Sequence, residues 1–452
     1  MDTAVEKKYN YWQWRTLIIL MVGYLLFYFV RKNFSLVMPA LESELGLTKL
    51  QLGTFLTING IVYGISRFTN GFLADRFSRK AIMAFGLALS AVVNIFIGLS
   101  PQLNGALNLL DGEGKATLGF AYFVGGLLII NGYMQGMGYP PCASLMANWF
   151  RPSELATKQS IWNSSHSIGA GLVALLCGFI LQRYSYSAWQ WCFFIPAALA
   201  LAGAVLVFFG LEDTPESVGL PSPEELDGEK KVTVKDHKSY RKFIHLMVFR
   251  NPIIWILAAT NFCVYVIRFT ILDWGTTFMT QYKGMDIAVA SSVVAASELF
   301  GGIVGTLVAG WATDKFFSSK AHRVCLICTL GATLSFFMFW KTPDSMNWLS
   351  IVFIVLSSFF VYGPQALLGI AASNQATKHA AASANGVLGI VGYVSPLVSG
   401  MLFGFLADSY GWDSVFAVAI GFGLLGAVVI ASMWKAPADG YEKAHSLGRE
   451  ED

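Results

Sequence analysis

The stretch GFLADRFSRK, residues 71–80, closes a long apolar run with one acidic and three basic residues. A shorter version, GWATDK at residues 310–315, follows 239 residues later. A YxxR motif also occurs twice, ending at Arg31 and at Arg268, 237 residues apart. In each half the YxxR motif lies in the first apolar run, and the GxxxD[RK] motif ends the second. Two matches at nearly one offset indicate an internal duplication, so the sequence predicts two pseudo-symmetric halves.

The composition predicts a membrane protein. Of 452 residues 55% are hydrophobic and 13% are charged, whereas soluble proteins average about 25% charged residues. These values exclude a soluble enzyme and a disordered chain. The 31 basic residues barely exceed the 28 acidic ones, so we expect the lipid bilayer, and no nucleic acid, as the surrounding partner. The apolar runs are long and do not alternate, which favours helices over a transmembrane β-barrel.

A helix needs roughly 20 mostly apolar residues to cross a bilayer. Twelve runs meet this requirement: 15–37, 53–74, 81–100, 117–148, 159–181, 189–211, 253–280, 287–312, 323–340, 347–372, 383–407 and 412–434. The polar segment 212–250 is predicted to be a linker between an N-terminal bundle, residues 1–211, and a C-terminal bundle, residues 251–452. Pro140 and Pro141 should kink the fourth helix because proline lacks the backbone donor.

The distribution of basic residues predicts the orientation. If both termini lie on one side, the connections on that side hold 22 Lys and Arg, and those on the other side hold 5. Basic residues concentrate in cytoplasmic loops. We therefore expect both termini and the linker in the cytoplasm, and the chain in the plasma membrane, which is the inner membrane of a bacterium.

Several motifs resemble those of one family. The run at residues 71–80 resembles the signature loop of the major facilitator superfamily. Within it, the motifs resemble the organophosphate:phosphate antiporter family: VRKNF (30–34), QGMGYPPC (135–142), WNSSH (162–166), YVIRFTILDW (265–274) and VYGPQ (361–365). The resemblance implies an all-α major facilitator fold, with twelve transmembrane helices in two six-helix bundles. It also implies a transporter rather than an enzyme, without a cofactor, a metal or catalytic residues.

Arg31 and Arg268 are the sharpest candidates for a binding site, even without the family. Each lies deep in an apolar run, where insertion of an arginine costs about 2.5–3.5 kcal/mol. Arginine presents a rigid fork of donors that matches a phosphate group. Alternatively, each arginine is a buried ion-pair partner of Asp273 or Glu298. The resemblance implies that the two arginines bind phosphate.

Five tyrosines are candidate ligands beside these arginines. Tyr28 and Tyr265 precede the arginines by one helical turn and share their faces. Tyr63, Tyr362 and Tyr393 are assigned to the cavity by resemblance alone. The alternative for each tyrosine is an ordinary packing role.

Four further residues are candidates around the substrate. His166 lies well inside an apolar helix, where a protonated ring would add a donor and a charge; the alternative is a core histidine bonded to a helix carbonyl. Trp162 and Asn163 belong to the same motif, and Asn163 could bind a sugar hydroxyl. Arg67 stands where the family commonly has a lysine, and it either attracts anions or forms a structural pair.

The remaining candidates are charged. Asp273 and Glu298 lie within apolar runs, and either could neutralise an arginine in the empty state. Asp75, Arg76 and Asp314 lie at the ends of helices, where such loops latch the halves of superfamily members in one state. Alternatively, these loop charges serve only to fix the topology.

The sequence thus predicts a monomeric antiporter that exchanges an organic phosphate ester for inorganic phosphate by alternating access. Residues 363–372, GPQALLGIAA, resemble hexose-phosphate members, which favours hexose 6-phosphate, such as glucose 6-phosphate, as the ester. Alternatives are a glycerol-3-phosphate:phosphate antiporter and a transporter-like membrane sensor of sugar phosphate.

Overall fold

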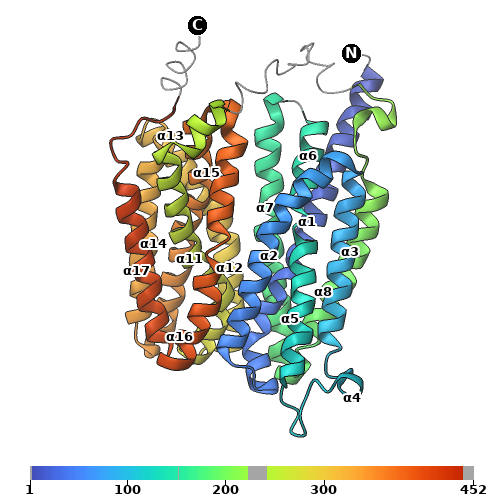
Figure 1. Ribbon diagram of the computed structural model, residues 1–452, viewed down its shortest axis with the longest axis vertical. Helices are drawn as coiled ribbons and strands as arrows, with labels where there is room; N and C mark the ends of the chain where they lie inside the picture. The colour runs from blue at the N-terminus through green and yellow to red at the C-terminus, as the bar shows by residue number, and fades with distance from the viewer. Residues whose placement is uncertain (1–2, 151, 222–241, 441–452) are drawn as a thin grey trace. The chain divides into compact units, whose positions relative to one another are not determined.

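The computed structural model describes residues 3–150, 152–221 and 242–440, and these residues are overwhelmingly helical (Figure 1). Within them, extended segments pair only in an isolated bridge between Leu110 and Ala116. In the described part of the chain, eleven helical segments are long and apolar enough to cross a membrane. The predicted all-α membrane class is confirmed, and the protein is an integral membrane protein.

The first six predicted runs correspond to the helices of the N-terminal half. These are α1 (Thr3–Leu45), α2 (Lys49–Arg76), α3 (Arg79–Gly98), the short α4 (Asn104–Leu107), α5 (Leu118–Gln135), α6 (Tyr139–Trp149), α7 (Pro152–Tyr184) and α8 (Trp191–Gly210). The 28-residue α2 is long enough to cross a bilayer but is not among the eleven apolar segments. It carries the polar residues Asn59, Arg67 and Asn70, which lower its hydropathy.

The last six predicted runs correspond to the helices of the C-terminal half. These are α11 (Pro252–Gln281), α12 (Ile287–Ala296) continuing through η4 (Ser297–Gly305) into α13 (Thr306–Phe316), α14 (Ala321–Lys341), α15 (Asn347–Gly392), η6 (Leu397–Leu402), α16 (Phe403–Tyr410) and α17 (Trp412–Ala431). Both η4 and η6 are π-helical. Such wide turns are rare and often occur at functional sites.

The fourth predicted run is interrupted at the expected place. Helix α5 ends at Gln135 and α6 begins at Tyr139, immediately before Pro140 and Pro141. Proline is tolerated in the first turn of a helix, where its missing donor has no intrahelical partner anyway. The two prolines therefore begin a new helical segment, and the run has a break rather than a uniform helix.

Helix α15 contains the predicted run 347–372 and the first part of the run 383–407, which continues through η6 into α16, and α15 is broken at Thr377. This residue has φ 59° and ψ 169°, which is not a helical conformation. A β-branched residue with positive φ is a genuine backbone outlier. The break lies between the two predicted runs, so the sequence placed the turn correctly although the helices nearly merge.

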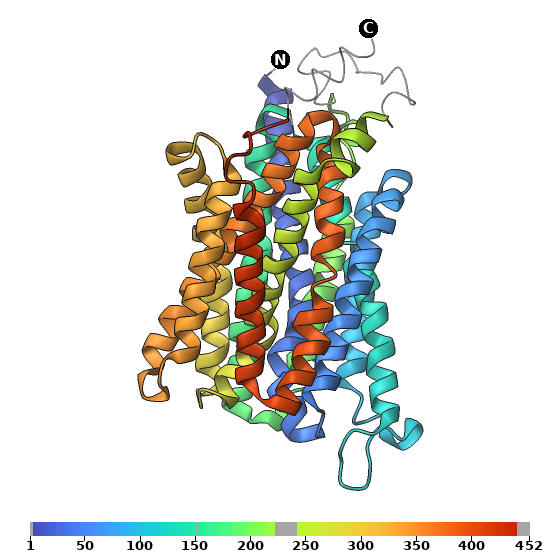
Figure 2. The same ribbon diagram turned by 60° about the vertical axis from the view of Figure 1, so that its left-hand side comes forward.

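The contacts divide the chain into two compact units. The first comprises Met1–Gln51, Ile58–Val232 and Asp286–Ala295, and the second comprises Leu52–Thr57, Thr233–Met285 and Ala296–Asp452. In the first unit α1 packs against α7 and α8, and α3 packs against α8 and α5 (Figure 1, Figure 2). In the second unit α15 packs against α11, α14 and η4, while α17 covers α11 and α14.

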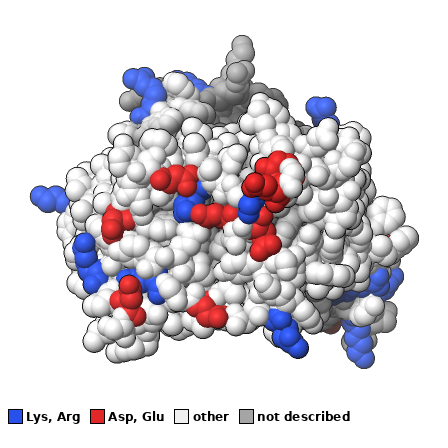
Figure 3. All heavy atoms as spheres, turned by 90° about the horizontal axis from the view of Figure 1, so that it is seen from below, with Lys and Arg blue, Asp and Glu red and all other residues white. Residues whose placement is uncertain are grey.

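Charged side chains are few on the face of the molecule that Figure 3 shows. Figure 3 shows one end of the helices, where small groups of acidic and basic side chains lie on a largely uncharged face. At the turn from α1 to α2 the Nζ atom of Lys49 lies 2.5 Å from a carboxylate oxygen of Glu42. Opposite charges in the connections are thus partly paired, as expected for ends that meet water.

Candidate functional site

In the first unit, Arg31 is half-buried on α1 and lies among aromatic rings. Its guanidinium carbon is 3.9 Å from the ring centroid of Tyr63 and 5.2 Å from that of Tyr28. Both tyrosines are buried. A guanidinium group donates hydrogen bonds in its own plane, so stacking on rings is compatible with binding an oxyanion at its edge. Three predicted site residues therefore lie together.

The predicted histidine lies next to this group. The ring of His166 is 5.5 Å from that of Tyr28, and its Nδ1 forms a hydrogen bond with the carbonyl oxygen of Asn163. A carbonyl only accepts, so Nδ1 carries a proton, and Nε2 lies 3.3 Å from the hydroxyl of Ser167. This hydrogen bond to a helix carbonyl is the contact expected if His166 is a core histidine. The His166 ring is buried and also contacts Tyr28. The side chain of Asn163 is exposed.

A second arginine–aromatic cluster lies in the same unit. The guanidinium carbon of Arg67 is 3.8 Å from the ring centroid of Tyr139. Tyr139 lies 5.7 Å from Trp162, and Trp162 lies 4.7 Å from Tyr24. Arg67 and Trp162 were predicted, but Tyr24 and Tyr139 were missed. Tyr24 could have been found, because it precedes Tyr28 by four residues and shares its helix face.

In the second unit, Arg268 is linked to an acidic residue through a tyrosine. Nη2 of Arg268 lies 3.3 Å from the hydroxyl oxygen of Tyr362, and that hydroxyl donates a hydrogen bond to Oε2 of Glu298. The exposed fractions of Arg268, Tyr362 and Glu298 are 6%, 2% and 1%. The three residues come from α11, α15 and η4. The structure therefore joins a predicted arginine to a predicted acid, with Tyr362 between them.

Two further tyrosines of the second unit lie beside this group. The guanidinium carbon of Arg268 is 5.8 Å from the ring centroid of Tyr265 and 5.6 Å from that of Phe269. Tyr265 in turn lies 6.0 Å from Tyr393. Asp273 is half-buried and follows Arg268 by five residues, which places it on another face of α11. Each arginine of the duplicated YxxR motif thus lies among tyrosines of its own unit.

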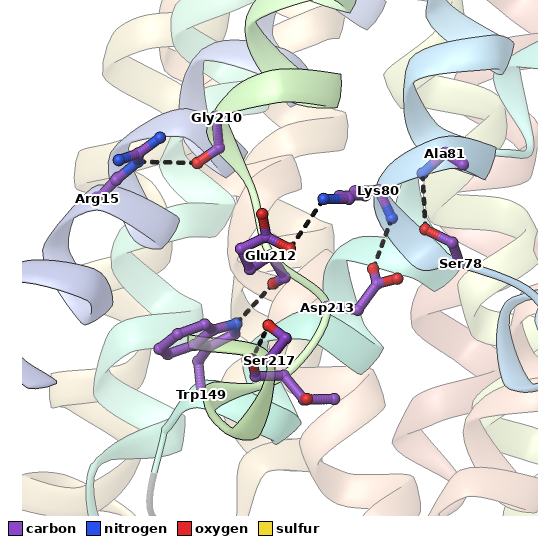
Figure 4. Close-up of polar contacts among 10 residues, drawn as sticks. Arg15, Ser78, Lys80, Ala81, Trp149, Gly210, Glu212, Asp213 and Ser217 are labelled. Carbon is purple, nitrogen blue, oxygen red and sulfur yellow. Dashed lines mark hydrogen bonds and ion pairs between the residues drawn. The ribbon is translucent and has the colours of Figure 1, made fainter. Parts of the chain in front are cut away.

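The start of α3 is bound to the segment after α8 by contacts that the sequence did not predict. Nζ of Lys80 lies 2.8 Å from Oε2 of Glu212, and the backbone N–H of Lys80 donates to Oδ1 of Asp213 at 2.9 Å (Figure 4). The indole of Trp149 donates to the carbonyl of Glu212 at 2.8 Å. The segment after α8 therefore caps the start of α3. The acidic pair itself is visible in the sequence directly after the sixth apolar run, but its partner Lys80 is not.

The predicted latch residues lie at helix ends. Arg76 is the last residue of α2 and is exposed. Asp314 is exposed near the end of α13 and accepts a hydrogen bond from Ser319 at 3.1 Å. The side chain of Asp75 lies outside the described part of the chain. The latch function of these residues stays a prediction.

Nearly the whole chain matches known proteins. The profile of the Major Facilitator Superfamily matches residues 20–316 and 276–451. A probable hexose phosphate transport protein of Chlamydia trachomatis is 32% identical over 97% of this chain and 94% of its own length. The glycerol-3-phosphate transporter of Bacillus subtilis is 32% identical over 96% of this chain and 95% of its own length.

A solved structure has the same fold. A bacterial homolog of the human lysosomal transporter Spinster, in an inward-facing conformation, has a TM-score of 0.72. It is 13% identical and the alignment covers 93% of this chain and 96% of that chain. The chain therefore belongs to the major facilitator superfamily and, within it, to the organophosphate:phosphate antiporter family. This is a family of transporters, which confirms the prediction that the protein is not an enzyme.

Proposed function

We propose that the protein exchanges an organic phosphate ester for inorganic phosphate across the membrane. The observation that carries this proposal is the repeated arrangement of an arginine among tyrosines. Arg31 lies against Tyr63 in the first unit, and Arg268 lies against Tyr362 in the second. In this proposal the two arginines bind one phosphate group together, each from its own half of the duplicated chain.

The charge of the ligand supports this pairing. A phosphomonoester carries about −1.5 to −2 charges at neutral pH. Two guanidinium groups neutralise such a dianion and match its oxygens as rigid donor forks. Without the dianion, the two positive charges repel each other. A ligand that binds one state better shifts the population towards it, so transfer is favoured only when a phosphate is bound. Such a carrier exchanges ligands rather than leaking.

The choice of ester rests on sequence similarity and on four residues of the first unit. The stretch GPQALLGIAA resembles hexose-phosphate members, and the Chlamydia trachomatis relative is a probable hexose phosphate transport protein. Trp162 and Tyr139 add aromatic surface beside Arg67, and the exposed amide of Asn163 suits a sugar hydroxyl. We therefore propose hexose 6-phosphate as the ester, with glycerol 3-phosphate as the second candidate, which the Bacillus subtilis relative favours.

The orientation follows from the charge distribution. With 22 basic residues in the connections on one side and 5 on the other, both termini are proposed to lie in the cytoplasm. The membrane is proposed to be the inner membrane of a bacterium, and the working unit a monomer.

Counterflow in liposomes tests the proposal. Purified protein is reconstituted in liposomes loaded with unlabelled phosphate, and entry of labelled phosphate is followed. Glucose 6-phosphate, glycerol 3-phosphate and phosphoglycerate are then compared as competitors. We expect phosphate exchange that glucose 6-phosphate inhibits most strongly. A folded protein that shows no exchange would contradict the proposed antiport, as expected of a pure sensor, and preference for glycerol 3-phosphate would overturn the choice of ester.

A further inference from the structure

We propose that Tyr362 is a positioning residue through which Glu298 controls the phosphate affinity of Arg268. The inference rests on the proposed function and adds a regulatory element to the second unit. Glu298 would balance the charge of Arg268 when the site is empty, and the tyrosine hydroxyl would transmit that effect. The proposal differs from a direct ion pair, because the hydroxyl group lies between the two charges.

The hydrogen-bond directions assign this role to the hydroxyl. A phenol has one hydrogen to donate and lone pairs that accept. Tyr362 donates its hydrogen to Glu298, so its oxygen is left to accept from Nη2 of Arg268 at 3.3 Å. The three side chains are at least nine-tenths buried. In a buried environment, consecutive hydrogen bonds polarise one another, and a change at one end is felt at the other.

The local backbone places Glu298 for this contact. Glu298 lies in the π-helical segment η4, and the same segment brings Gly301 against Tyr362. A Cβ atom at Gly301 would lie 3.0 Å from Cδ2 of the Tyr362 ring. One at Gly305 would lie 2.3 Å from the carbonyl oxygen of Phe359. The absence of side chains at these two glycines lets η4 approach α15 closely enough for Glu298 to reach the hydroxyl.

The arrangement has a consequence for exchange. In the empty site, Arg268 donates to a tyrosine whose oxygen is made more negative by its hydrogen bond to a carboxylate. An arriving phosphate competes with Tyr362 for the donors of the guanidinium group. Without the negative charge of Glu298, the tyrosine is a weaker competitor and Arg268 is less well balanced. Phosphate should then bind more tightly and leave more slowly.

Glu298→Gln tests this effect with little change in shape, because the amide oxygen still accepts from Tyr362. We expect the KM for phosphate and the kcat of exchange to fall together, each by about threefold or more, as for residues coupled in one network. A merely structural role predicts a lower kcat with an unchanged or higher KM. Unchanged values of both KM and kcat would overturn the proposal.

A double-mutant cycle separates transmission through the hydroxyl from action through space. Tyr362→Phe removes the hydroxyl but keeps the ring. In this background we expect Glu298→Gln to have no further effect on KM. If Glu298→Gln lowers KM equally in both backgrounds, Glu298 acts directly through space and the role of Tyr362 is wrong.

Two controls and one binding measurement complete the test. Glu113→Gln and Tyr410→Phe make the same chemical changes at exposed positions and should leave both constants unchanged. Calorimetric titration with inorganic phosphate gives the Kd of the wild type, the two single variants and the double variant. These four values form the same cycle without a transport step. If the wild type neither binds nor exchanges phosphate, the proposed function fails. If the wild type both binds and exchanges phosphate, but the effects of Glu298→Gln and Tyr362→Phe on phosphate affinity are additive, only this inference fails.

Discussion

The guanidinium carbon of Arg31 lies 3.9 Å from the centre of the Tyr63 ring, so a charge on α1 rests on an aromatic face from α2. Tyr63 is 2% exposed, and a cation–π contact is stronger when water is excluded. The contact fixes the plane of the guanidinium group before any ligand arrives. Arg31 is therefore held in place by its own unit.

Replacing Tyr63 by leucine should weaken phosphate binding. The substitution removes the aromatic face but keeps a buried apolar side chain. A cation–π contact contributes about 0.5–2 kcal/mol, which corresponds to a roughly 2- to 30-fold higher Kd for phosphate. Calorimetric titration of the purified protein measures this change.

Tyr63→Phe is the matched control for that prediction. It keeps the ring beneath Arg31 and removes only the hydroxyl, so affinity should stay close to that of the wild type. Equal losses in Tyr63→Phe and Tyr63→Leu would show that the hydroxyl, rather than the aromatic face, is the important group.

The cap on α3 should matter more for stability than the ion pair beside it. Asp213→Ala removes the carboxylate that accepts from the backbone of Lys80, and loss of a cap costs about 0.5–2 kcal/mol. Glu212→Gln removes only the charge of a partly exposed ion pair, which contributes about 0–1 kcal/mol. Thermal unfolding in detergent should show a larger drop in Tm for Asp213→Ala. The reverse order would contradict this assignment.

The close packing of η4 against α15 makes a second stability prediction. At Gly305 an added methyl group would lie 2.3 Å from the carbonyl oxygen of Phe359, and backbone cannot yield easily. Gly305→Ala should therefore lower the Tm by several degrees and reduce exchange. Gly421→Ala is the control, because a methyl group there meets no atom within 4 Å. A Gly305→Ala protein as stable as the Gly421→Ala protein would refute the close contact.

The loop after α11 predicts a pH effect. Burial, together with a hydrogen bond to Asp413, raises the pKa of Tyr282 from 10.0 to about 12. Between these two values the folded protein keeps a proton that the unfolded chain loses, so stability falls as pH rises. Burial lowers the pKa of the neighbouring Lys283. Below the ordinary pKa of lysine the unfolded chain therefore binds more protons at this residue than the folded protein does, so this residue makes stability rise with pH.

Comparison with Tyr282→Phe isolates the tyrosine, because Lys283 is present in both proteins. From pH 10 to pH 11.5 the Tm of the wild type should fall more steeply than that of the variant. Parallel curves would mean that Tyr282 titrates normally in the folded protein.

Much of the fold could be predicted from the sequence because hydropathy and proline positions are local properties. The break before Pro140 lies at the two prolines that predict a kink within the fourth apolar run, and the turn at Thr377 lies between two apolar runs. The long extension of α1 beyond its apolar run was not predicted. Residues at the start of α1 are polar, and their helix is stabilised by contacts distant in sequence, such as the hydrogen bond from Gln13 to the carbonyl of Trp149.

The candidate site could be predicted only in part. Motif symmetry identified Arg31 and Arg268, because buried arginines are rare enough to be noticed singly. The link from Arg268 through Tyr362 to Glu298 joins three separate helices, and no sequence spacing reports such a contact. The cap by Asp213 was missed for the same reason, since its partner lies 133 residues away.

The most direct test of the central claim is exchange of labelled phosphate by proteoliposomes that contain Arg31→Lys, Arg268→Lys or both substitutions. Lysine keeps the charge but loses the planar donor fork. We predict that each single substitution reduces exchange at least tenfold and that the double substitution abolishes it. Exchange at the wild-type rate in the folded double variant would contradict the proposal that a guanidinium group from each half binds the phosphate.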